Sequence, residues 1–436
     1  MKKLILSFAL IISLVSASFA DSGFTHRFFE IKVDVPVSVS NNLMSLSDIF
    51  QKVVVVDLPK IADSLPDNGA SIKADVAPTI SIGVDIPRGL ILGINIGAEA
   101  DVSVGLSKDI FDFIGHGNNG KTELKQNTSN TYADLFAYAS LDVGWNTKQT
   151  RLKVTGSGFS SLGHFDAGDT YVKVYSNDDK SGFEAKVDAK LYSPIDYSNG
   201  FNDTQALLSN LGNNLGFDVG VEYQKDIFKF LTVGGNVRMP LKPSTLSMLS
   251  QVSKDIEYSF SFDELLGGSS SNEENNEGGE GENTESTEEA AEENNNSSDF
   301  IQKAIVLDTP YKIHRPFKLG VSADFHPFGT LLTTTGYLGL GFRHPFAAAI
   351  NKSTGGVDET QVYVDYSIAG RLSLWNILSL TLSHSYLDEI FKNELALALN
   401  IRLVEVDAGV SFQSPSFTKS FTGAGVGAFV TVCVGF

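Results

Sequence analysis

The stretch GAFVTVCVGF, residues 427–436, alternates apolar residues with small or polar ones. In an extended strand, Val430, Val432, Val434 and Phe436 fall on one face, and the residues between them fall on the other. One strand of this kind also suits the half-buried sheet of a soluble protein. The fold class therefore depends on whether the pattern repeats along the chain.

The same two-sided pattern recurs through most of the 436 residues. It is found in residues 29–39, 90–104, 133–145, 183–191, 217–223, 317–325, 378–382, 395–403 and 404–412. Many of these runs reach about ten residues, which exceeds the usual strand of a soluble sheet and matches a tilted strand that crosses a membrane. The pattern favours an all-β protein whose apolar faces meet lipid.

The connections between these runs alternate in length. Short ones fall at 85–88, 146–148, 176–181, 225–228, 326–330, 375–376 and 402–404, and longer ones at 41–69, 106–130, 159–169, 193–214, 242–315, 344–359, 387–392 and 413–422. Short periplasmic turns and long extracellular loops are typical of outer-membrane barrels. The sequence thus predicts a transmembrane antiparallel β-barrel of about sixteen strands (14–18), with both termini in the periplasm and long extracellular loops.

Aromatic residues are expected at both membrane interfaces of such a barrel. Trp145, Trp375 and Phe436 fall at predicted periplasmic strand ends, and with Val432 and Val434 they are the predicted membrane anchors. The closing strand that ends in Phe resembles the signal read by the machinery that inserts bacterial barrels. Outer-membrane lipid and that insertion machinery are therefore the expected partners, and the expected location is the bacterial outer membrane with surface-exposed loops.

The N-terminus has the features of a secretory signal peptide. Lys2 and Lys3 precede the apolar run 4–15, and Ser18-Phe19-Ala20 offers small residues for cleavage. We therefore expect residues 1–20 to be a signal peptide and residues 21–436 to form the barrel. A single cysteine excludes an intramolecular disulfide.

Two segments interrupt the strand pattern. In residues 41–69, Leu58, Ile61 and Leu65 have helical spacing and Ser47 or Asp48 is the expected helix cap. This predicts a partly helical loop or a plug, and an ordinary surface loop explains the segment equally well. Residues 242–315 form a long acidic loop, of which 267–299 have no hydrophobic anchor and are expected to be disordered. Residues 263–299 hold thirteen of the carboxylates behind the net charge of −19. This acidity argues against nucleic acid as a partner.

Catalytic chemistry has no clear signature in the sequence. His384 precedes a serine, but no acidic residue is placed to orient it, and none of the seven histidines belongs to a recognisable metal motif. We therefore predict no enzyme, no catalytic residue, no metal site and no cofactor.

Aromatic residues on the predicted inward face point to a different role. Phe136, Tyr138, Tyr337, Tyr363 and Phe429 lie on the polar side of their strands and could line a path for a hydrophobic substrate. Packing around an inserted loop would explain the same residues.

The stretch FEIKVDVPVSVSNNLMSLSDIF, residues 29–50, resembles bacterial outer-membrane barrels related to the long-chain fatty-acid transporter class. Chain size, signal peptide and terminal Phe are similar to that class as well. The resemblance implies a channel or transporter that passes small, hydrophobic, fatty-acid-like molecules by passive diffusion. Members of the class carry an Asn-Pro-Ala motif in an N-terminal plug, and this chain has no such tripeptide. A surface adhesin or structural barrel with ligand-binding loops, and a general porin, remain alternatives; the substrate and the oligomeric state stay open.

Overall fold

The computed structural model describes most of the chain beyond the expected signal peptide. The described residues are 27–43, 57–65, 69–116, 123–125, 131–167, 171–176, 181–196, 209, 212–260, 304–350, 360–401 and 403–436. The expected signal peptide 1–20 and the acidic stretch 267–299 lie outside them, so both remain predictions.

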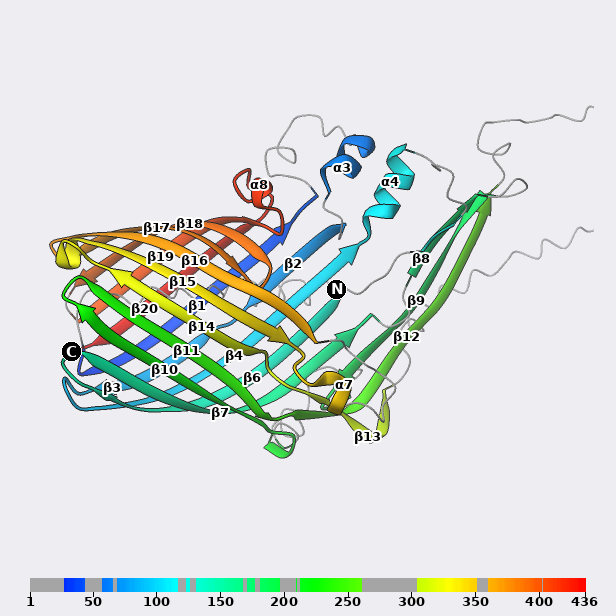
Figure 1. Ribbon diagram of the computed structural model, residues 1–436. Coiled ribbons are helices and arrows are strands. Elements are labelled where there is room, and N and C mark those ends of the chain that lie inside the picture. The colour runs from blue at the N-terminus through cyan, green and yellow to red at the C-terminus, as the bar shows by residue number, and fades with distance from the viewer. Residues whose placement is uncertain are drawn as a thin grey trace, which may run out of the picture.

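A closed antiparallel barrel of fourteen strands forms the main body of the described residues (Figure 1). β2 and β3 are counted as two halves of one strand, because both pair with β1 and β4 and are separated only by Ala77-Pro78. The wall strands are β1 (Phe29–Asn41), β2 (Ala70–Val76), β3 (Thr79–Asp85), β4 (Leu90–Leu106), β6 (Tyr132–Asn146), β7 (Thr150–Asp166), β10 (Gly216–Phe228), β11 (Leu231–Lys242), β14 (Phe317–Phe325), β15 (Leu332–Arg343), β16 (Gln361–Leu374), β17 (Leu378–Leu387), β18 (Ile390–Ile401), β19 (Val404–Ser414) and β20 (Val426–Gly435).

The first and last strands close the barrel. β1 pairs with β20 from Glu30 opposite Gly435 to Val39 opposite Val426. The backbones of Phe29 and Phe436 exchange two hydrogen bonds, with N···O distances of 3.1 and 3.0 Å. Closure leaves no sheet edge in the wall, so its backbone groups can be paired without water.

The two faces of the wall differ as the alternation predicts. In β20, Val430 and Val434 point outward and are 46% exposed, whereas Phe429 and Cys433 point inward and are buried. An apolar outer face in contact with water would be strongly unfavourable, and lipid removes that penalty. The predicted all-β, antiparallel membrane barrel is confirmed in its architecture, with fourteen wall strands at the lower end of the predicted range.

The connections differ in length between the two ends of the barrel. At the end that carries both Phe29 and Phe436, here called the terminal end, short turns join the strands at 86–89, 147–149, 229–230, 326–331 and 375–377. At the opposite loop end the connections between wall strands are longer, with one exception. The sequence predicts a long connection at 387–392, but it is the two-residue hairpin turn 388–389 between β17 and β18. This asymmetry is the one that the sequence predicts.

A second group of strands extends the sheet beyond the loop end of the barrel (Figure 1). This extension consists of β5 (Glu123–Lys125), β8 (Tyr171–Ser176), β9 (Ser181–Ser193), β12 (Ser244–Phe260) and β13 (Ile305–Ile313). β9 and β12 pair along their length, from Ser193 opposite Met248 to Ser181 opposite Phe260. The predicted number of sixteen strands includes β8 and β9 in the barrel wall. The structure corrects this, because both strands lie in the extension. β12 and β13 occupy the two ends of the predicted loop 242–315.

Short helices lie at the ends of the barrel. They are α3 (Leu58–Ser64), α4 (Lys108–His116), α7 (Ala347–Ile350), α8 (Phe417–Ser420) and the 3₁₀ turn η2 (Gly329–Leu331). α3 falls in the predicted partly helical segment 41–69 and is capped by Asp57, whose side chain accepts a hydrogen bond from the Lys60 N–H. α3 lies beside α4 above the loop end (Figure 1). Among the described residues, none of the helices has the length and apolar character needed to cross a membrane.

Candidate functional site in the barrel lumen

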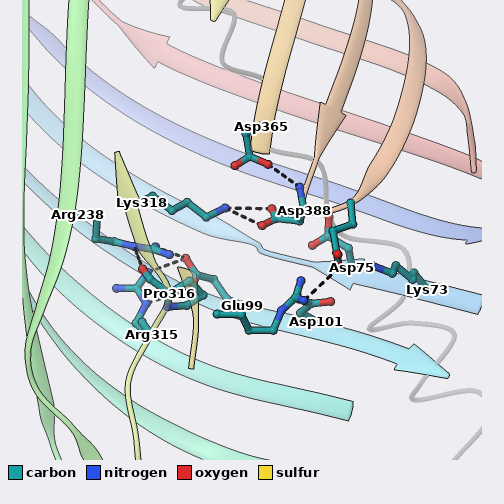
Figure 2. A network of polar contacts seen from close by, with 12 residues as sticks. Lys73, Asp75, Glu99, Asp101, Arg238, Arg315, Pro316, Lys318, Asp365 and Asp388 are labelled. Carbon is teal, nitrogen blue, oxygen red and sulfur yellow. Dashed lines mark hydrogen bonds and ion pairs between the residues drawn. The ribbon is translucent and has the colours of Figure 1, made fainter. Parts of the chain in front are cut away.

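Ion pairs cross the lumen near the loop end (Figure 2). Arg315, between β13 and β14, donates to Glu99 of β4 at 2.6 Å and to Asp218 of β10 at 2.8 Å. Arg238 of β11 also donates to Glu99, at 3.1 Å. β4 and β14 are separated in the wall by β6, β7, β10 and β11. The contact between Arg315 and Glu99 therefore joins parts of the barrel wall that are far apart along its circumference.

The charge state of Arg315 follows from these contacts. Burial lowers the pKa of its guanidinium, but the adjacent Glu99 and Asp218 carboxylates outweigh burial and raise the pKa above its ordinary value. The guanidinium also lies 4.3 Å from the ring centre of Tyr138, within range of a cation–π contact. Arg315 is thus held as a buried cation.

A second set of ties starts from Arg343 at the end of β15. Its guanidinium meets Asp101 of β4 at 3.2 Å and Glu389 of the β17–β18 turn at 3.2 Å. Lys73 of β2 also donates to Glu389, at 2.9 Å. Burial raises the pKa of Glu389, but Lys73 and Arg343 outweigh it and hold the pKa below its ordinary value. Glu389 therefore links three parts of the wall.

The β17–β18 turn is fixed by a third contact (Figure 2). Lys318 of β14 donates to both carboxylate oxygens of Asp388 at 3.0 Å, and the Asp388 N–H donates to Asp365 of β16 at 2.9 Å. Asp388 and Glu389 have positive φ angles of 49° and 68°, as a tight hairpin turn requires. This turn directs its two carboxylates toward the cations of β14 and β15.

Together these contacts place paired charges inside the lumen. The side chains of Arg315, Asp218 and Arg343 are only 2–3% exposed. A buried charge that loses its partner is strongly unfavourable, so the pairs hold each other in place. We call the residues Lys73, Glu99, Asp101, Asp218, Arg238, Arg315, Lys318, Arg343, Asp365, Asp388 and Glu389 the luminal ion network.

The five predicted path residues all face inward, as the alternation indicates. Four of them lie against glycines of adjacent strands: Tyr138 against Gly97, Tyr337 against Gly320, Tyr363 against Gly341 and Phe429 against Gly409. A side chain at any of these glycines would overlap the ring. Rings that cover glycines in this way are a known device for stabilising curved sheets. Packing against these glycines is enough to explain why the four rings face inward. Their role in a path for a hydrophobic substrate stays a prediction.

Phe136 has a different environment. It is 3% exposed and packs with Phe159 at a ring-centre distance of 5.9 Å. The surrounding cluster combines wall residues with residues of the extension, namely Phe136, Phe159, Tyr192, Leu246, Tyr311 and Ile313. This cluster is the apolar core through which the extension packs against β6 and β7.

The predicted anchors lie on the outward side. Trp375 is 86% exposed, Phe436 is 69% exposed and Trp145 is 55% exposed. Val434 is exposed and Val432 is partly exposed on the same outward face of β20. The Phe436 ring also contacts Phe28 and Phe29, at ring-centre distances of 6.3 and 5.8 Å. Aromatic side chains therefore gather at the terminal end near the point of closure.

A mainly apolar groove of about 950 Å³ lies in the wall where the barrel closes. It runs over β1 and β17 to β20, and its lining includes the outward-facing Val35 and Val430 and the inward-facing Phe429 and Glu394. Its volume and apolar character are typical of pockets that bind small molecules.

The sequence does not predict the luminal ion network. Glu99 and Arg315 are 216 positions apart, and no local spacing signals their contact. It also does not predict the cluster of Asp134, His164 and His344, whose polar atoms lie close enough to hold a metal ion. Inward-facing charge in strands is the only sequence signal that such contacts have.

Several solved structures resemble the chain. The toluene transporter TodX of Pseudomonas putida is 9% identical over 98% of this chain and 96% of that chain, with a TM-score of 0.43. The CymD monoaromatic hydrocarbon channel is 8% identical over 97% and 94%, with a TM-score of 0.44. A FadL homologue of Pseudomonas aeruginosa is 8% identical over 94% and 90%, with a TM-score of 0.42.

These names belong to the class that the sequence resembles. Identities of 8–9% and TM-scores of 0.42–0.44 are too low to carry an argument, so the barrel rests on its own strand pairings. No curated protein matches the sequence. A family model described as "Family of unknown function (DUF5723)" matches residues 26–410, and the chain belongs to that family.

Proposed function

We propose that this chain is a bacterial outer-membrane channel, without enzymatic activity, that admits small hydrophobic molecules by passive diffusion. The observation that carries this proposal is the apolar groove at the closure of the barrel. Its lining is formed largely by outward-facing residues such as Val35, Val430 and Leu395, so a hydrophobic molecule could bind there against the wall from the lipid side. Apolar surface of this extent favours a hydrophobic ligand over a hydrated one.

The luminal ion network also supports the proposal, because it argues against a channel for hydrated solutes. A general porin keeps a water-filled lumen, whereas here Arg315 and Arg343 form ion pairs across it. A hydrated solute would have to separate buried ion pairs to pass. We therefore expect sugars and ions to be excluded while a hydrophobic molecule enters through the groove.

Uptake into liposomes tests the proposal. The full chain, refolded into vesicles, should admit a labelled long-chain fatty acid faster than empty vesicles do, and should not admit a labelled small sugar. Ala428 is a small groove residue on the outward face of β20. Ala428→Trp fills the groove and is expected to lower fatty-acid entry at least several-fold.

Ala139→Trp is the matched control. Ala139 is also a small outward-facing residue, but it lies in β6 and outside the groove. This variant should retain the uptake of the parent chain. If both tryptophan variants transport equally well, the groove is not the route, and if sugar enters as readily as fatty acid, the general-porin alternative is correct.

The five inward aromatics are retained as the proposed luminal part of the path. Phe429 lines the groove, and Tyr138 lies under the guanidinium of Arg315. Phe429→Asp would introduce a charge on the luminal side of the groove and is expected to slow fatty-acid entry. Unchanged entry in this variant would remove Phe429 from the path.

A surface scaffold with ligand-binding loops is the second candidate. The extension favours it, because β9 and β12 pair beyond the loop end of the barrel and would project from the membrane. A scaffold of this kind needs no transport. Vesicles that admit neither fatty acid nor sugar would support it.

A further inference from the structure

Three side chains from distant parts of the sequence meet at the loop end of the lumen. The two carboxylate oxygens of Asp134 in β6 contact His164 Nδ1 of β7 at 2.6 Å and His344 Nε2 at 2.7 Å. One ligand atom from each residue lies within 4.8 Å of the other two. All three side chains are buried, and His164 is only 1% exposed.

The residue types favour a transition metal. Two imidazoles and one carboxylate suit Zn²⁺ and its neighbours in the first transition series, whereas Ca²⁺ and Mg²⁺ prefer oxygen ligands. Bonds of roughly 2.0–2.1 Å to zinc separate tetrahedral ligand atoms by about 3.3 Å. The contacts of 2.6 and 2.7 Å therefore need to widen by less than about 1 Å to admit an ion.

The surroundings orient His164 as a histidine that binds a metal is usually oriented. The His164 ring stacks on Tyr311 at a centre distance of 5.1 Å and on Tyr192 at 5.9 Å. Its second nitrogen, Nε2, lies 3.3 Å from the Tyr311 hydroxyl, so Nδ1 is directed at Asp134. A partner on the second ring nitrogen is the common means of fixing a histidine ligand.

The backbone makes a tight turn directly after β15. His344 has a φ of 46°, which histidine adopts more readily than most residues, and Phe346, two residues on, has a φ of 65°. This turn brings the imidazole of His344 from the end of β15 to Asp134 of β6.

We propose that Asp134, His164 and His344 form a binding site for a transition-metal ion of the Zn²⁺ type, which ties the segment after β15 to the opposite wall. Three protein ligands leave one tetrahedral position for water. The ion also supplies positive charge to the buried Asp134 carboxylate.

Zinc retention tests this proposal. The full chain is refolded in detergent with Zn²⁺, dialysed, and its metal content is measured. The parent chain should retain about one Zn²⁺ per barrel. His344→Gln should weaken retention by at least the roughly 100-fold that loss of a supporting partner can cause. His344 lies beyond the last residue of β15, so the wall can form without it.

His326→Gln is the matched control. It also removes one histidine, but from a turn at the terminal end of the barrel, and should retain the metal. Co²⁺ adds a spectroscopic readout, because the parent chain should show the visible absorption of a low-coordinate site and His344→Gln should not. Asp134→Asn, with its folding checked by the heat-dependent gel shift of a barrel, provides a second ligand variant.

Equal zinc retention in the parent chain and His344→Gln would overturn the proposal and leave a hydrogen-bonded His–Asp–His cluster. Loss of zinc in His326→Gln to the same extent would overturn it as well, since binding would then be non-specific. Metal retention is measured without any transported solute, so a failure of transport leaves its outcome unaffected.

Discussion

Arg315 joins two carboxylates from different strands inside the lumen. It meets Glu99 and Asp218 with side-chain contacts of 2.6 and 2.8 Å and covers the ring of Tyr138. Asp218 is at least as buried as Arg315, with side chains that are 2% and 3% exposed. Because the Asp218 carboxylate cannot be rehydrated without local opening, its pairing with Arg315 offsets the cost of burying it, and Arg315 also pairs with the partly exposed Glu99.

Arg315→Gln is expected to lower the free energy of unfolding by about 3–5 kcal/mol, since it leaves the buried Asp218 without its cation. Urea unfolding of the refolded chain in detergent measures the change. Arg238→Gln is the control, because Arg238 is 23% exposed and shares Glu99 with Arg315. Arg238→Gln should lower the free energy of unfolding by about 1 kcal/mol or less. An equal decrease in unfolding free energy in the two variants would contradict a special role of Arg315 in stabilising the buried Asp218.

Glu389 makes a pH-dependent contribution to stability. Its pKa in the folded chain lies below its ordinary value of about 4.3, so its stabilising effect is present above that value and is lost as the pH falls through the folded pKa. Between about pH 5 and pH 7, the parent chain should have a higher urea midpoint than Glu389→Gln. Below about pH 4 the difference should narrow toward zero. A difference that stays constant down to pH 3 would argue against this reading.

Glu222→Gln is the matched control for Glu389. Glu222 forms an exposed ion pair with Lys153 at 2.8 Å. Exposed pairs contribute little to stability, so this variant should have a urea midpoint close to that of the parent at neutral pH.

The last strand, β20, completes the wall by pairing with both β1 and β19. Its backbone bonds to Phe29 do not depend on the side chain of Phe436. Phe436→Ser should therefore refold in detergent almost as well as the parent chain. Assembly in bacterial outer membranes, measured as the heat-modifiable fraction, should fall several-fold if the terminal Phe is read by the insertion machinery.

Trp375→Ser separates this effect from a general loss of interfacial aromatics. Trp375 is also exposed at the terminal end, but it lies in the turn between β16 and β17. Its assembly should stay near that of the parent chain. Equal defects in the two variants would mean that Phe436 acts only as an interfacial anchor.

The elements also show how far sequence reasoning extends. Alternation and turn length predict the wall strands, because a lipid-facing side and a polar side demand a period of two. They cannot distinguish β8 and β9 from wall strands, because an alternating sequence predicts a strand but does not show which other strand it pairs with. Residues 183–191 alternate as wall strands do, yet β9 pairs with β12 in the extension.

The same limit applies to the candidate site. The alternation of the sequence predicts that Tyr363 and Phe429 face inward. Their contacts with Gly341 and Gly409 depend on the register between neighbouring strands, which the sequence does not show. The contact between Arg343 and Asp101 depends on closure of the whole barrel. The sequence therefore indicates which residues enter the lumen, while the fold decides which of them meet.

At the scale of the whole molecule, the barrel combines an apolar outer face, an apolar groove at its closure and a lumen crossed by ion pairs. These features support the proposed channel for hydrophobic molecules over an open pore. An open pore of fourteen strands would leave an aqueous channel, and ions would then pass continuously.

The most direct measurement compares two fluxes through one preparation of the refolded chain: entry of a labelled long-chain fatty acid into vesicles, and ion conductance across a planar bilayer. We predict fatty-acid entry above that of empty vesicles, together with no steady conductance. Steady conductance with no preference for the fatty acid would contradict the account, and so would the absence of both fluxes.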